Sequence, residues 1–204
     1  MSNYTVIADA GTALVQLLRK ELVPDIVKNS TSIGLASPAD KGDMVICVHL
    51  YDVSESEVYR VSGMISESVD TQKFPPVYLT LSYLITVFSA SDVKFRSQDE
   101  QRILGKVAQV LRDHPTMNPD TMEFDTESGE DRIRVEMIKA DADEKSKAWS
   151  FPNQAPRLSL FYRIGPVALE SARTKNVPRV QEMEFKKENA LNPFAKIFRR
   201  DREK

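Results

Sequence analysis

The sequence is poor in the residues used for nucleophilic and metal chemistry. Its 204 residues include one cysteine, two histidines and seven glycines. A single cysteine excludes an intramolecular disulfide and is typical of a protein that folds in a reducing compartment. The glycines never fall close enough together for a P-loop or a dinucleotide fingerprint, which excludes nucleotide binding through those motifs.

Long apolar runs are also missing. No run approaches the roughly 20 residues that span a bilayer, because Thr80, Ser82 and Thr86 interrupt the best one. The first residues, MSNYTVIADAG, lack the basic start and the apolar core of a secretory signal. We therefore expect that the chain does not insert directly into a membrane. We expect it to assemble in the cytoplasm.

The overall charge is close to neutral. The formal net charge is −2, so the balance does not favour binding to nucleic acid or to an anionic membrane. Hydrophobic residues make up 41% of the chain and charged residues 28%, as in an ordinary globular protein. These values predict a folded, buried core.

Apolar residues at helical spacing predict two long helices. The first runs from Val6 to Leu22 and is ended by Pro24. Ser97 and Glu100 form a capping-box pair that predicts the start of the second helix, which Pro115 ends. A shorter helical stretch precedes Trp149.

Alternating or continuous apolar residues predict five strands, with a weak sixth between 54 and 74. They are Ser32–Ala36, Met44–Val53, Pro75–Ser89, Arg132–Ile138 and Arg157–Ile164. In the last of them we expect Leu158, Leu160, Tyr162 and Ile164 to point inward. The acidic stretch 116–131 is predicted as a long connection.

This order of elements predicts an α+β fold. We expect one mixed β-sheet of four or five strands, with helices packed mainly on one face. Residues 1–171 are predicted to form the domain, because the chain turns polar and then basic beyond it. Residues 172–204 are predicted to form a C-terminal extension.

Cys47 and His49 are the only candidates for catalysis or metal binding. Two positions apart on a strand, they lie on one face at a separation of about 7 Å, which suits a nucleophile with its base or half a metal site. The same face also carries Tyr51, and the spacing supplies no further ligands. We therefore expect packed core residues here, with no catalytic, cofactor-binding or metal-binding residues. His114, just before Pro115, is expected to cap the end of its helix.

The C-terminal tail is locally basic and carries aromatic residues. From Lys186 onward there are seven basic and three acidic residues. One interpretation is a frayed, solubilising terminus, and the other is a partner-docking helix laid in a groove. The candidate docking residues are Phe194, Ile197, Phe198, Arg199 and Arg200. Binding of nucleic acid by so few charges would be weak and sensitive to salt.

Several separate blocks resemble a known family. They are PPVYLTLSYLITVFSASD at residues 75–92, DEQRILGKVAQVLRDHP at 99–115, VHLYDVSES at 48–56 and Trp149 followed by PRLSLFYRI at 156–164. The chain resembles the Pvc/Afp-type tail-terminator, or cap, family of extracellular contractile injection systems, which are phage-tail-like particles. Members carry a proline pair, an L-x-L-x-Y-L-(I/V)-T strand and a Q-x-x-L-G helix ending in His-Pro. The likeness covers roughly Val6 to Ser171.

The resemblance implies a tail-terminator-like fold and a structural role without catalysis. It implies a homo-oligomeric ring, expected to be a hexamer, at the distal end of the inner tube and the last sheath layer. Such a ring ends polymerisation of both, with the tube protein and the sheath protein as partners, in a particle that is released or anchored. The alternatives are another adaptor of the same machine, at the baseplate or tube end, or a small enzyme that uses Cys47 and His49.

Overall fold

A computed structural model describes residues 4–56, 58–60, 62–68, 70–125, 132–152 and 154–176. Three α-helices lie in these ranges: α1 (Val6–Leu22), α2 (Val93–Asp113) and α3 (Ala142–Ala148). The strands are β1 (Ile33–Leu35), β2 (Ile46–Glu55), β3 (Ile65–Ser66), β4 (Thr71–Lys73), β5 (Val77–Val87), β6 (Thr116–Met117), β7 (Phe124–Asp125), β8 (Ile133–Met137), β9 (Ser159–Leu169) and β10 (Thr174–Asn176). None of the described helices is long and apolar enough to cross a bilayer.

Seven of these strands form one mixed sheet in the order β1-β2-β5-β9-β8-β6-β7. The pair β1–β2 is parallel and the remaining pairs are antiparallel. The predicted α+β class and mixed sheet are confirmed. The predicted four or five strands are too few, because β6 and β7 have only two residues each and fall within the stretch 116–131, expected to be a plain connection.

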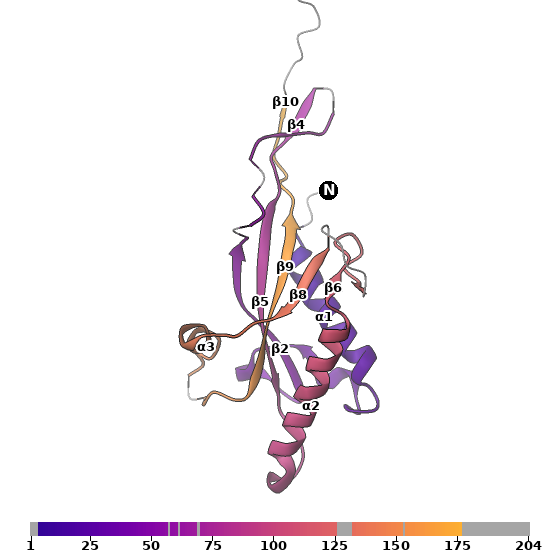
Figure 1. Ribbon diagram of the computed structural model, residues 1–204, viewed down its shortest axis with the longest axis vertical. Coiled ribbons are helices and arrows are strands. Elements are labelled where there is room, and N and C mark those ends of the chain that lie inside the picture. The colour runs from indigo at the N-terminus through magenta and orange to yellow at the C-terminus, as the bar shows by residue number, and fades with distance from the viewer. Residues whose placement is uncertain are drawn as a thin grey trace, which may run out of the picture.

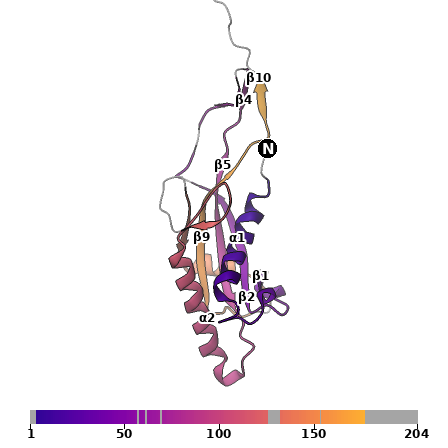
Figure 2. The same ribbon diagram turned by 90° about the vertical axis from the view of Figure 1, so that its right-hand side faces the viewer.

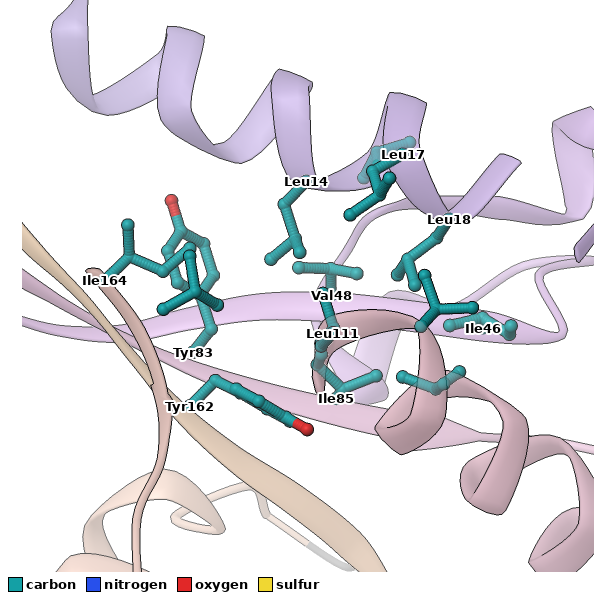
Figure 3. Close-up of a cluster of buried hydrophobic side chains, with 14 of the residues drawn as sticks. Leu14, Leu17, Leu18, Ile46, Val48, Tyr83, Ile85, Leu111, Tyr162 and Ile164 are labelled. Atoms are coloured by element: carbon teal, nitrogen blue, oxygen red, sulfur yellow. The ribbon is translucent and has the colours of Figure 1, made fainter. Parts of the chain in front are cut away.

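The two faces of this sheet are covered unequally. Helices α1 and α2 pack on one face, where Leu14 and Leu18 of α1 point toward Val48 and Ile46, with Leu111 of α2 in the same cluster (Figure 3). The opposite face carries a smaller cluster beneath α3. Its buried members are Leu84, Ala140, Ala148, Trp149 and Phe161. The helices therefore lie mainly on one face, as predicted.

The three remaining strands form a separate small sheet in the order β10-β4-β3. We call this sheet and the residues that connect it to β2, β5 and β9 the arm. It rises beyond the upper end of β5 and β9, away from α2 and α3 (Figures 1 and 2). Its strand β10 lies past the predicted domain boundary at 171 and pairs with β4. The boundary itself stays a prediction.

The long elements match their predicted positions, with two corrections. Helix α1 has the predicted bounds, and β5 lies within the predicted strand. Helix α2 begins four residues before Ser97, after its N-cap Asp92, so the Ser97–Glu100 capping box is wrong. Leu158 is 63% exposed rather than inward, because β9 begins one residue later.

Candidate functional site

Cys47 is a buried structural residue of β2. Its side chain is fully buried, and this burial raises the pKa of the thiol to about 11, opposed only by the nearby charge of Lys41. A thiol with such a pKa is protonated near neutral pH and reacts slowly, since the thiolate is the nucleophile. The expected packing role is what the structure shows at this position.

His49 lies in an aromatic cluster. Its ring meets the ring of Phe151 edge-on with 5.4 Å between centroids, and Phe151 meets Trp149 in the same way at 5.8 Å. Partial burial lowers the pKa of the imidazole. Across the described ranges no group of three or more His, Cys, Asp or Glu side chains could hold a metal ion. His49 therefore packs against Phe151 while it stays partly exposed.

The other sequence candidates fall into two groups. His114 follows α2, and its Nδ1 lies 2.9 Å from the carbonyl oxygen of Val110, so the predicted helix-capping role is confirmed. The candidate docking residues Phe194, Ile197, Phe198, Arg199 and Arg200 lie outside the described residues. Their role stays a prediction.

Glu100 ties three segments together at the base of α2. Its Oε1 accepts a hydrogen bond from Nη2 of Arg157 at 2.7 Å and from the backbone N–H of Ser89 at 3.3 Å. The hydroxyls of Ser89 and Ser91 both donate to the neighbouring carboxylate of Asp99. These bonds fix the direction in which α2 leaves β5, and its first turns project past the sheet (Figure 1).

The outer edge of β2 is open over its second half. Strand β1 pairs only with Ile46 to Val48, and the last bond on that side runs from the N–H of Ala36 to the carbonyl of Val48 at 3.2 Å. Beyond Val48 no described strand lies along this edge, although β2 continues to Glu55. Such an edge is a template for pairing with another strand.

A groove lies beside β8, which is three strands away from β2 across the sheet. It has a volume of about 1150 Å³ and runs between the second half of α2 and the edge of β8. Its lining includes Leu111, Arg112, Arg134, Val135 and Met137. Strand β6 pairs with the first two residues of β8, and the N–H of Val135 donates to the carbonyl of Pro115 at 2.8 Å, so only Glu136 and Met137 are left uncovered on this edge.

The arm exposes apolar side chains and is held by few contacts. Val58 is 84% exposed and Ile65 is 43% exposed. The ammonium of Lys73 lies 2.7 Å from the carboxylate of Glu170, and the hydrogen bond between them lowers the pKa of Glu170. The guanidinium of Arg173 stacks 4.5 Å from the centre of the Phe74 ring. These pairs fasten the arm where it leaves the main sheet.

The open edge of β2, the groove and the arm are exposed surfaces of the part of the chain that the structure describes. Sequence reasoning missed all of them, because pairing partners of a strand are not visible in its own residues. The sequence offered one signal, since Val53 and Met137 are apolar residues near the ends of their strands, and the structure exposes 42% and 54% of them. The arrangement can extend a sheet or receive an extended segment from another chain.

Comparison with known proteins shows the family of the chain and solved structures that share its fold. The family model described as "Pvc16 N-terminal domain" matches residues 9–182. A solved structure of the sheath/tube terminator of PVC, an extracellular contractile injection system, in its extended state has a TM-score of 0.63 at 21% identity. A solved structure of the anti-feeding prophage cap, a tube terminating cap, has a TM-score of 0.56 at 19% identity.

Coverage differs between the two sides of these alignments. The matches cover 91% and 86% of this chain, but only 64% and 59% of the two solved chains. None of the curated proteins matches the chain significantly. At these identities the solved structures establish a shared fold.

Proposed function

Because the chain belongs to the Pvc16 N-terminal domain family, we propose that it is the tail-terminator, or cap, subunit of a contractile injection system. It caps the distal end of the inner tube and the last sheath layer and so ends the growth of both. The observation that carries this proposal is the family match over residues 9–182, and the likeness to a sheath/tube terminator and a tube terminating cap supports it.

The proposal includes a ring of identical subunits, as a hexamer. A cap that meets a cylindrical tube repeats one set of contacts around an axis, which closed cyclic symmetry provides. Six copies of the 23.1 kDa chain have a mass of about 139 kDa. Contacts that are each modest are multiplied around the ring, so the cap is held by avidity.

We further propose that the subunit acts without catalysis or a cofactor. The buried thiol of Cys47 supports this, because its raised pKa keeps it protonated near neutral pH, and the ring of His49 packs against Phe151. Residues 1–171 act as the ring-forming domain, and residues 172–204 act as an extension that carries the candidate docking residues. The subunit assembles in the cytoplasm and then forms part of the particle.

Deletion of the gene tests the role directly. Without the terminator, tubes are expected to vary widely in length and particles to lack stable sheaths in electron micrographs. Complementation with the wild-type chain is the control and restores a narrow length distribution. Sheathed particles of normal length from the deletion strain would contradict the proposal.

A label on the subunit separates the terminator from an adaptor elsewhere in the machine. A tag at the C-terminus is expected to appear at the end of the tube opposite the baseplate. A label at the baseplate end would favour an adaptor. Activity that is lost in a Cys47→Ala variant while assembly is retained would instead favour an enzyme.

A further inference from the structure

A second pocket lies beside the open edge of β2, on the face of the sheet that α1 covers. It has a volume of about 420 Å³ and lies between the start of α1 and the place where β1 stops. Ile7, Ala8 and Gly11 line it from α1, and Leu35 and Leu50 line it from the two strands. None of the described residues in its lining is a lysine, an arginine, an aspartate or a glutamate. We call it the β2 pocket.

Tyr83 of β5 lines the β2 pocket with an unused hydroxyl. Its side chain is only 1% exposed, and its hydroxyl has no hydrogen-bond partner among the described residues. The hydroxyl points from β5 toward α1 (Figure 3). Buried hydroxyls are normally hydrogen-bonded, and one without a partner costs free energy. A segment bound in the pocket can supply this partner through its backbone.

The backbone of β2 beside the pocket faces outward. The carbonyl of Val48 accepts the last bond from the β1 side, from the N–H of Ala36 at 3.2 Å. Because alternate residues of a strand direct their backbone groups to the same side, the N–H and C=O of Leu50 also point outward. A strand that continued the line of β1 would bond to these groups and cover the β2 pocket.

The outward direction is kept up to the end of β2. The N–H of Ser56 donates to the carbonyl of Tyr78, toward β5, at 2.7 Å. Alternation then directs the backbone groups of Val53 and Glu55 away from β5. No described strand pairs with them on that side. This half of β2 therefore offers a row of bonding groups to an added strand.

Charge separates this edge from the groove beside β8. The second half of β2 carries Asp52 and Glu55 and no lysine or arginine, and the exposed Arg60 makes only a 4.0 Å contact with Glu55. The groove beside β8 is lined by Arg112 and Arg134 against a single acidic residue. A basic segment with apolar side chains is therefore complementary to the edge of β2 and is repelled by that groove.

Residues 194–200, which we call the tail segment, have this chemistry. Their sequence FAKIFRR includes three basic residues and no acidic one. Phenylalanine and isoleucine are enriched in strands, and Pro193 stands where proline is tolerated, at the start of a strand. The tail segment lies outside the described residues. It is the occupant that the charge of the edge favours.

The connecting chain is long enough for this contact. Strand β10 ends at Asn176, and the eighteen residues 177–194 can span up to roughly 60 Å. From Asn176 the path runs back along the arm to the end of β9, past four rows of the sheet to Val53, and across three strands. At the usual rise and strand spacing this path is about 40 Å long. The tail segment can therefore reach the edge of β2 in its own chain.

We propose that the tail segment docks on the open half of β2 in its own chain as an added strand, with an apolar side chain in the β2 pocket. A strand is favoured over a helix, because the edge offers backbone groups along its length. In this position the tail segment covers an edge that is otherwise a template for pairing with other chains. The inference does not depend on the proposed cap role.

Disulfide scanning of the purified full chain tests the docking. In a Cys47→Ala background, Val53→Cys is combined in turn with a single cysteine substitution at each position from 194 to 200. An added strand turns alternate side chains to one face, so disulfides within the chain are expected to form several-fold faster at positions two apart than at the position between them. The matched control uses Gln101→Cys, at an exposed position on α2, in place of Val53→Cys and is expected to show no such alternation.

The outcomes of the scan are distinct. No disulfide at any position, or equal rates along the tail segment, would overturn the docking. Fast positions three or four apart would indicate a helix and overturn the added strand. Disulfide-linked dimers in place of closed monomers would assign the edge to the tail segment of another copy and overturn docking within one chain. Because the scan uses the purified chain, none of these outcomes bears on tube length or on the cap role.

A substitution in the β2 pocket gives a second readout. Ala8 is exposed and lines the pocket, so Ala8→Trp fills it and leaves the buried side of α1 unchanged. Hydrogen exchange at the outward N–H groups of Val53 and Glu55 is expected to become about tenfold faster or more, because the added strand is displaced. Thr12→Trp, at an exposed position one turn further along α1 and outside the pocket lining, is the control and is expected to leave this exchange unchanged. Slow exchange along β5 shows that each variant is folded. Equal exchange at β2 in both variants and wild type would overturn the docking.

Discussion

Strands β5 and β9 pass through two different environments. Along β5, every residue from Leu81 to Val87 is buried between α1 and α2 on one face and the α3 cluster on the other. Toward its start the same strand becomes partly exposed and reaches 42% exposure at Val77, where the chain comes from the arm. The same pair of strands therefore supports a core at one end and a free surface at the other.

This contrast separates stability from assembly. Burial of apolar area supplies most of the free energy of folding. This free energy therefore comes mainly from the lower half of the sheet, where the buried side chains lie. The arm and the upper half of β2 bury little and can change without unfolding the domain. Substitutions at the two ends are therefore expected to differ in kind as well as in size.

The largest loss of stability is expected in the core. Leu18 of α1 is fully buried in the main cluster, so Leu18→Ala removes packing and leaves a cavity. We expect the free energy of unfolding to fall by about 2–5 kcal/mol. Urea unfolding followed by circular dichroism measures it. Lys20→Ala, at an exposed position of the same helix, is the control, and a loss below about 1 kcal/mol for Leu18→Ala would contradict the contrast.

An intermediate effect is expected from alkaline titration of Cys47. Its folded-state pKa is raised from 9.0 to about 11, so the folded protein favours the protonated thiol. The resulting stability is fully present below pH 9 and is lost as the pH rises to about 11, by on the order of 2 kcal/mol. Cys47→Ala removes this group, and its unfolding free energy is expected to fall less over the same interval. Parallel pH profiles of the two proteins would contradict the expectation.

A small effect is expected at the base of the arm. The hydrogen bond from Lys73 lowers the pKa of Glu170 in the folded protein, so its stabilisation is present above the ordinary pKa of 4.5 and is lost as the pH falls. Because the pair is partly exposed, Glu170→Gln is expected to cost only about 0.2–1 kcal/mol at neutral pH. The difference between wild type and variant should shrink below pH 4. A difference that grows in acid would have the wrong sign.

The smallest change in stability is expected at the tip of the arm. Ile65 is largely exposed, so Ile65→Asp is expected to change the unfolding free energy by less than about 0.5 kcal/mol. Thermal unfolding of the variant beside wild type checks it. A loss comparable to that of Leu18→Ala would show that the arm belongs to the cooperative core.

The elements that bury a full face could be predicted from the sequence. Helix α1 and strand β5 carry long periodic apolar patterns, and each element lies within the bounds of its pattern. The start of α2 could not be predicted, because a pair with the spacing of a capping box lies inside the helix, where Glu100 binds Arg157 instead. Strands of two or three residues, such as β6 and β3, are too short to show a period.

The candidate surfaces were harder to predict for a different reason. The pattern correctly indicated that Cys47 packs, because its strand is apolar on both sides. It gave no sign that β1 stops beside Val48 or that β6 covers only the start of β8. An open edge is a property of what the rest of the chain fails to cover, and it emerges only once the strand order is known.

The short links from β5 and β9 to the arm have a mechanical consequence. Short links, residues 74–76 and 170–173, join β5 and β9 to the strands of the arm, and the hydrogen bonds between β5 and β9 lie perpendicular to their length. A pull on the arm along the strands loads many of these bonds in shear at once rather than peeling them one after another. If the arm grips a neighbour, tension from a contracting machine would pass directly into the best-packed part of the molecule.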